Sequence, residues 1–147
     1  MHGFTVTAAE VANAQARAET WVKRFDAVLN MDLPFNKVGI AHLTCTLIAP
    51  TKEEYIETLS LLPEKEMKRL FSKAAELGVG IELNFRYPEE NTELLLRPYF
   101  IAKACGCKFY LGSDAHTTKG LAGAPQNFKR ILEALELQES DRFSLVN

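Results

Sequence analysis

The sequence predicts an α/β protein in which parallel strands alternate with helices. Short segments rich in strand-forming residues begin near positions 38, 79 and 108. The longer segments around them repeat apolar residues at three- and four-residue steps, which is the spacing of an amphipathic helix. Strands separated by helices in this way form right-handed parallel βαβ units. Such units build either part of a (β/α) barrel or a small doubly wound sheet.

The first helix is expected over residues 7–30. Thr7 and Glu10 at its start have the form of a capping box, in which each side chain binds a free backbone amide of the other residue. Apolar residues then recur on one face of the segment. Trp21 and Phe25 lie on that face and are expected in the core.

The middle of the chain is expected to hold a buried strand followed by two helices. Residues 38–43 are apolar at five of six positions, as in a strand that is covered on both faces. Helix-forming residues follow from 51 to 60. A second helix begins at Pro63, a residue that suits a first helical turn, and ends near Gly78, which suits a helix C-terminus.

Polar and apolar residues alternate in the next expected strand, residues 79–85. Glu82 and Asn84 therefore share one face of this strand. Inside a barrel, two such side chains would face an active centre or a buried polar network. On an open sheet they would face water.

One more helix, strand and helix complete the expected order. The helix covers residues 92–105 and ends at Gly106, and the strand covers residues 108–112. A long helical pattern then runs to about residue 135. With a fourth strand at residues 4–6, these elements make roughly half of a barrel, since a full barrel takes about 250 residues.

The composition excludes several classes of function. The chain has 147 residues, 47% of them hydrophobic, and a net charge of -2, with basic residues scattered along it, so no nucleic-acid surface is predicted. No apolar run approaches the roughly 20 residues of a membrane span, and no signal-peptide layout is seen. The three cysteines form no CxxC pair and indicate reduced thiols, so a cytoplasmic location is expected. GxGxxG, P-loop and GxSxG motifs are absent from the sequence.

Candidate metal ligands fall at the carboxyl ends of two expected strands. His42 belongs to residues 38–43, and Asp114 and His116 follow residues 108–112. In parallel α/β folds these strand ends lie on the same side, where active sites collect. Imidazole and carboxylate groups suit zinc, manganese or iron. Each residue also has a structural interpretation, because His42 could be a core histidine and the Asp-x-His pair could cap the following helix.

Four segments together resemble the polymerase and histidinol phosphatase (PHP) superfamily of metal-dependent phosphoesterases. Residues 112–116, Gly-Ser-Asp-Ala-His, resemble the last metal motif of that family. Residues 39–42 resemble its strand that ends in a ligand histidine, and residues 80–84 resemble its strand with a Glu-x-Asn pattern. His2, just before residues 4–6, resembles a ligand histidine at the end of an earlier strand.

The resemblance implies a fold and a ligand set. Residues 1–147 would form a single partial PHP-type domain, the C-terminal part of a (β/α)7-type, distorted TIM-like barrel that lacks the N-terminal strands. His2 and His42 would share one metal, Asp114 would hold another, and His116 a third. The family begins with a His-x-His motif, which this sequence lacks. The chain alone is therefore expected to bind divalent metals weakly or not at all and to be inactive.

The implied activity of the intact protein is hydrolysis of a phosphorylated small molecule, and Arg86 is the expected substrate-binding residue. A guanidinium group suits phosphate geometry, although Arg86 could equally form a surface ion pair with Glu89 or Glu90. Lys119 is a weaker candidate, for which a solvated loop lysine is the better interpretation. Glu82 is expected to support the site through hydrogen bonds.

Other functions fit parts of the same pattern. A half-barrel would expose strand edges, so self-association is expected. The alternative to an enzyme is a non-catalytic α/β module with structural histidines at positions 42 and 116 that serves a partner protein. A third interpretation is another metallohydrolase barrel, such as an amidohydrolase, but the Glu82-x-Asn84 strand and the Ser-Asp-Ala-His ending favour the phosphoesterase.

Overall fold

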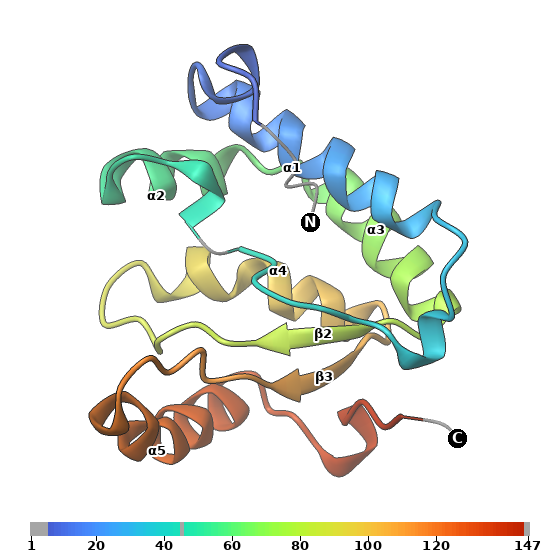
Figure 1. Cartoon of the computed structure of the whole chain (residues 1–147), viewed down its shortest axis with the longest axis vertical. Helices are drawn as coiled ribbons and strands as arrows, with labels where there is room; N and C mark the ends of the chain where they lie inside the picture. Colours follow the sequence, from blue (N-terminus) through green and yellow to red (C-terminus); the bar gives the residue numbers. More distant parts are fainter. Residues whose placement is uncertain (1–5, 45, 146–147) are drawn as a thin grey trace.

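A computed structural model of the chain describes residues 6–44 and 46–145. Figure 1 shows a helical layer beside a small sheet. The described elements are the helices α1 (Ala14–Leu29), α2 (Lys52–Leu61), α3 (Glu64–Leu77), α4 (Thr92–Ala104) and α5 (Thr118–Ala134), and the strands β1 (Gly39–Ile40), β2 (Gly80–Leu83) and β3 (Lys108–Leu111). His2 and nearly all of the strand expected at residues 4–6 lie outside the described residues.

The three described strands form one parallel sheet in the order β1-β2-β3. Gly39 pairs with Gly80, and Gly80 in turn pairs with Lys108, so the three strands are in register. This confirms the α/β class with parallel βα units. The chain also returns to the outer edge of β3 after α5, where Phe143 N donates a hydrogen bond of 2.8 Å to Phe109 O. That parallel contact was not predicted from the sequence.

Strand β1 is much shorter than expected. The sequence predicted a strand over residues 38–43 buried on both faces, but only Gly39 and Ile40 pair, and Gly39 is exposed. No described strand pairs with the outer edge of β1. The chain leaves the sheet at His42, whose φ of 55° is left-handed. An apolar run shows that a strand can form, but burial of both of its faces needs a layer packed on each side of the sheet.

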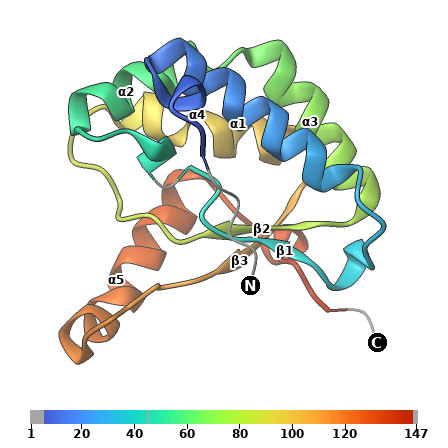
Figure 2. The same cartoon turned by 45° about the horizontal axis from the view of Figure 1, so that its top comes forward.

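The core lies between the helices and one face of the sheet. Figure 2 shows α1, α3 and α4 on the same side of the strands. Trp21 and Phe25 are buried there as predicted, and both rings pack edge-on against Phe71, at centroid distances of 6.3 and 5.4 Å. The indole nitrogen of Trp21 donates to Leu43 O at 2.8 Å and so ties α1 to the segment after β1.

The helix boundaries follow local chemistry, with one correction near the N-terminus. Thr7 and Glu10 make the expected capping box, but it closes a short 3-10 turn rather than α1. Helix α1 starts after Asn13, whose side chain accepts a hydrogen bond from Ala16 N at 2.9 Å. An Asn at this position supplies an acceptor that favours a new helix start. Gly78 ends α3 with a φ of 76°, as predicted.

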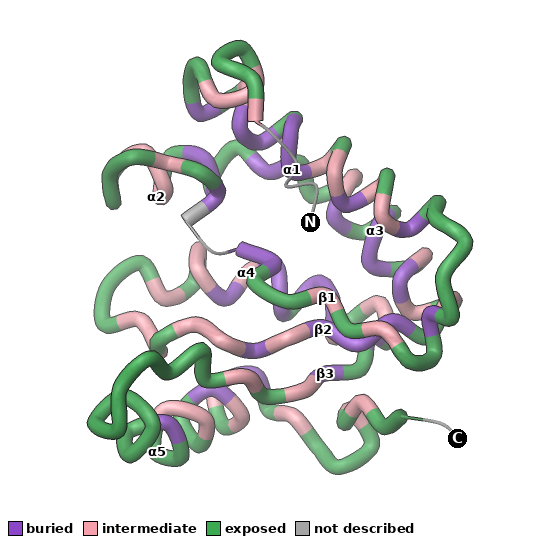
Figure 3. The backbone as a smooth tube through the Cα atoms, viewed as in Figure 1, coloured by how far each residue is buried: buried purple, intermediate pink, exposed green. Residues whose placement is uncertain are grey.

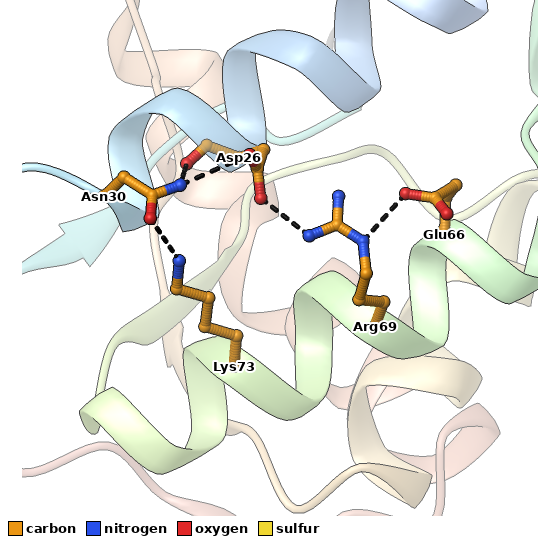
Figure 4. A network of polar contacts seen from close by, with 5 residues as sticks. All are labelled: Asp26, Asn30, Glu66, Arg69 and Lys73. Carbon is orange, nitrogen blue, oxygen red and sulfur yellow. Dashed lines mark hydrogen bonds and ion pairs between the residues drawn. The ribbon is translucent and has the colours of Figure 1, made fainter.

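Helices α1 and α3 are also joined by a polar network on the surface, drawn in Figure 4. Arg69 on α3 donates to Asp26 on α1 at 2.7 Å and to Glu66 one turn back at 2.8 Å. Lys73 donates to Asn30 at 2.6 Å. These contacts fix the relative rotation of two helices whose apolar faces form the core.

Helix α5 stands apart from this packed layer. Figure 3 shows exposed backbone along the β3–α5 loop and the first turns of α5. Its C-terminal half is anchored by the buried side chains of Ile131 and Leu135. Among the described residues, no helix combines the length and the apolar character needed to cross a membrane.

Candidate functional site

The carboxyl ends of the three parallel strands deliver polar side chains to one cleft of about 950 Å³. His42 follows β1, Asn84 follows β2 and Asp114 follows β3, and all three line this cleft. Arg86 lines it as well. The structure therefore brings together four of the residues that the sequence marked, from three separate strand ends.

His42 is held by the residues of the neighbouring strand. Its backbone amide donates to Glu82 Oε2 at 2.9 Å, and its Nδ1 lies 3.9 Å from the same oxygen. Asn84 Nδ2 makes a short contact with His42 Nδ1. The ring of His42 therefore meets both a side-chain amide and a carboxylate through Nδ1. The side chain of His42 is 46% exposed, which leaves room for a ligand beside it.

Glu82 of β2 holds the backbone of His42 through a hydrogen bond. Its side chain is only 12% exposed, and it lies on the sheet face that it shares with Tyr110 of β3. Burial raises the pKa of the Tyr110 phenol, and the charge of Glu82 raises it further. The carboxylate also packs directly over Gly112, where a side chain would leave it no room.

Asp114 and His116 belong to the loop between β3 and α5. Both line a second hollow of about 650 Å³, which shares Asn84, Arg86 and Asp114 with the main cleft. The interpretation of the Asp-x-His pair as a helix cap is wrong, because Thr117 caps α5 and accepts from Gly120 N at 3.0 Å. Asp114 itself has a left-handed φ of 46°.

Arg86 keeps its charge available to a ligand. Its side chain is exposed, and within the described parts of the chain it makes no hydrogen bond or ion pair. The expected alternative, an ion pair with Glu89 or Glu90, does not form there, since Glu90 pairs with Lys52 at 2.9 Å. Lys119 lines only the second hollow.

Helix α5 contributes two cleft residues that sequence reasoning missed. Asn127 binds the backbone beside Arg86, and Arg130 stacks on Tyr87 with its guanidinium carbon 4.3 Å from the ring centroid. Asn127 and Arg130 are three residues apart and so share a helix face. That spacing could have shown from the sequence that the two side chains lie on one face of α5. It does not show which loop that face contacts.

The described donor groups do not fit a metal cluster by themselves. Within residues 6–44 and 46–145, no three His, Cys, Asp or Glu side chains come close enough together to hold an ion. His42 and Glu82 form one pair, while Asp114 and His116 stand on the β3–α5 loop. The fourth expected ligand, His2, lies outside the described residues. The metal sites therefore stay a prediction.

Comparisons with known proteins do not assign the chain to a family. No protein-family model matches it, and neither the curated proteins nor the solved structures contain a match. The resemblance to the PHP superfamily thus rests on the sequence motifs quoted above.

Proposed function

We propose that this chain is the C-terminal part of a PHP-type phosphoesterase domain and that its cleft binds the phosphate group of a small phosphomonoester. One observation carries the proposal. Three parallel strand ends bring an imidazole, a side-chain amide and a carboxylate to one cleft beside an arginine that has no partner among the described residues. Ligand sites of parallel α/β proteins collect at this edge of the sheet.

The strand order is consistent with the barrel part of the proposal. A barrel adds each new strand beside the previous one, as does each half of a doubly wound sheet up to its switch point. Here β1, β2 and β3 follow one another in space as in the chain. The segment after α5 continues the series, because Arg142 forms a parallel bridge with Phe109 on the far edge of β3. In a barrel, the face with Glu82 and Tyr110 would be the interior.

The cleft residues have distinct roles in this proposal. Arg86 binds two phosphate oxygens through its planar guanidinium, which matches the geometry of a phosphate group. His42 donates a hydrogen bond from its imidazole to a third oxygen or to the leaving-group oxygen. Asn84 and Glu82 hold the imidazole in place. Hydrolysis is assigned to the intact domain, since the described residues do not complete the family's ligand set.

A phosphate titration of the purified chain tests this function. Inorganic phosphate and phenyl phosphate should shift the Arg86 side-chain signal in nuclear magnetic resonance spectra in a saturable way. Replacement Arg86→Ala should weaken binding about tenfold or more, because a hydrogen bond to a charged group contributes about 1.5–3 kcal/mol. The matched control is Arg142→Ala, which removes an exposed arginine that pairs with Glu139 beside the outer edge of β3 and does not line the cleft.

The outcome of that titration separates binding from catalysis. No saturable shift in the wild-type chain would refute the proposed phosphate site. Addition of manganese or zinc with p-nitrophenyl phosphate should give little or no turnover with this chain alone. Substantial turnover would show instead that the chain holds a complete catalytic site.

A second candidate is the non-catalytic α/β module with structural histidines. The contacts of His42 favour it, because Glu82 binds the backbone of this residue and Asn84 contacts its ring, so both tie the end of β1 to β2. In that case His42→Ala should lower the free energy of unfolding by about 1–2 kcal/mol, and phosphate should not bind. Chemical denaturation, combined with the phosphate titration, distinguishes the two functions.

Self-association and a cytoplasmic location belong to the same proposal. The outer edge of β1 has no strand partner among the described residues, and a second copy could cover it. Size-exclusion chromatography with light scattering should then show a dimer that dissociates on dilution, whereas a monomer at all concentrations would contradict it. The described cysteines, Cys105 and Cys107, are free thiols, which suits a reducing compartment.

A further inference from the structure

The loop that carries Arg86 is held by helix α5. Asn127 Oδ1 accepts a hydrogen bond from Tyr87 N at 2.7 Å, and Asn127 Nδ2 donates one to Phe85 O at 3.0 Å. These two backbone groups flank Arg86 on either side. One side-chain amide therefore gives the loop the pair of hydrogen bonds that a neighbouring strand would give to a strand.

A second contact from the same face of α5 strengthens this hold. Arg130 lies over the ring of Tyr87, with its guanidinium carbon 4.3 Å from the centroid. Cation–π contacts of this kind favour one orientation of the aromatic ring. Both neighbours of Arg86 are thus tied to α5, while the Arg86 side chain remains exposed and lines both hollows of the candidate site.

We propose that Asn127 is a positioning residue, which orders the backbone on both sides of Arg86 and so holds the guanidinium where a phosphate group can meet it. The ligand class rests on the proposed function, whereas the ordering of Arg86 does not. Without Asn127, Phe85 O and Tyr87 N lose their partners and the loop gains conformational freedom. A ligand would then have to order the loop as it binds, which weakens its affinity.

Ordering of the loop is tested without any ligand. The backbone amides of Arg86 and Tyr87 are followed by nitrogen-15 relaxation and by hydrogen exchange. In the wild-type chain we expect an order parameter near 0.85 for Arg86 and a protected Tyr87 amide, and in Asn127→Ala an order parameter below about 0.6 with protection lowered about tenfold.

Two further variants control for other effects of the substitution. Gln126→Ala removes the preceding side-chain amide of α5, which makes no hydrogen bond with the described residues, and should leave both signals unchanged. Asn127→Asp keeps an acceptor for Tyr87 N and should retain the protection of that amide, although it cannot donate to Phe85 O. Wild-type order and protection in Asn127→Ala would overturn the inference.

Phosphate binding shows whether the ordered loop serves the site. Titration with inorganic phosphate should give a dissociation constant about three- to tenfold higher for Asn127→Ala than for the wild-type chain, because the ligand must pay the ordering cost. An unchanged constant together with a disordered loop would also overturn the positioning role. If the wild-type chain binds no phosphate, the proposed function fails, and the order parameter of Arg86 alone then decides whether Asn127 positions this residue.

Discussion

The carboxylate of Glu82 occupies the space that a side chain would need at position 112. A Cβ built on Gly112 would lie 1.9 Å from Glu82 Oε1 and 2.7 Å from its carboxyl carbon. The other oxygen of the same carboxylate accepts the hydrogen bond from His42 N. A glycine directly after β3 thus allows a glutamate on β2 to hold a histidine after β1, across the whole sheet.

Replacement Gly112→Ala should therefore displace Glu82 and release His42. Forcing a methyl group into an occupied space costs about 1–3 kcal/mol. Urea denaturation should show this loss in the wild-type background and a much smaller one in a Glu82→Ala background, where the space is free. Equal losses in both backgrounds would contradict the direct contact.

A second glycine provides the control for this prediction. Gly123 lies within α5, and a Cβ added there meets no atom within 4 Å. Because alanine is the better residue in a helix, Gly123→Ala should stabilise the chain by up to about 1 kcal/mol. The two substitutions both replace glycine with alanine, but they should change the free energy of unfolding in opposite directions.

The helices could be predicted from the sequence because their information is local. In α3, Met67, Leu70, Phe71 and Ala74 repeat at helical spacing, and all four are buried. Gly78 supplies the left-handed residue that ends the helix. Patterns of this kind depend on residues within one or two helical turns, so they can be recognised without knowledge of contacts between distant residues.

The predictions about the site that were wrong or missing concern contacts between residues that are distant in the sequence. The apolar run at 38–43 could not reveal that β1 would be an edge with only two paired residues. Asn127 meets Tyr87 across 40 positions, and no local pattern carries that contact. The cap of α5 is Thr117 rather than Asp114, three positions earlier, although aspartate ranks above threonine as an N-cap residue.

The network between α1 and α3 should make stability depend on acid pH. The hydrogen bond from Arg69 holds the pKa of the Asp26 carboxyl below its ordinary value of 3.8, and the positive charges of Arg69 and Lys73 add to this effect. The unfolded chain then binds the proton first as the pH falls. The contribution of this pair is present above about pH 4 and is lost as the pH falls below 3.8.

Asp26→Asn measures that contribution. Both side chains are more than a third exposed, so solvent screening limits the effect to about 0.2–1 kcal/mol at pH 7. The difference between wild type and Asp26→Asn should shrink when urea denaturation is repeated at pH 3. In an Arg69→Ala background the substitution should have almost no effect at either pH, and a full effect there would exclude this ion pair as the cause.

Cys107 should behave as an inert buried thiol. Burial raises its pKa from 9.0 to about 12, and Sγ donates to Phe71 O at 3.2 Å. At pH 8 an aromatic disulfide reagent should label Cys107 only after unfolding, while the partly exposed Cys105 reacts in the folded chain, as peptide mass spectrometry would show. Labelling of Cys107 at the rate of Cys105 would contradict its burial.

The same pKa shift has a consequence for stability at alkaline pH. The unfolded chain loses the Cys107 proton near pH 9, whereas the folded chain keeps it up to about pH 12. Stability should therefore fall as the pH rises through this interval. The slope of unfolding free energy against pH should be shallower for Cys107→Ala than for the wild-type chain between pH 9 and 10.5, a range that denaturation experiments can reach.

The buried guanidinium of Arg17 should make Glu54 the most sensitive acidic residue of α2. The side chain of Arg17 is only 2% exposed, and Nη2 lies 2.7 Å from Glu54 Oε2. Its Nε donates to Thr58 and its Nη1 to Val11 O, so it joins α1 to α2 and to the N-terminal turn. Glu54→Gln would leave a charge in the interior without its counter-ion, at a cost of about 3 kcal/mol.

Glu53→Gln is the matched control for this substitution. Glu53 also lies in the first turn of α2, so both variants lose the same interaction with the helix dipole, but Glu53 is exposed. Its substitution should cost less than about 1 kcal/mol. Arg17→Met should cost less than Glu54→Gln, because it removes the buried charge itself while the 39% exposed Glu54 side chain returns to water. Urea denaturation of the three variants at pH 7 gives the order directly. A larger loss for Arg17→Met than for Glu54→Gln would show that the hydrogen bonds of the guanidinium to Thr58 and Val11, rather than its ion pair with Glu54, hold α1 against its neighbours.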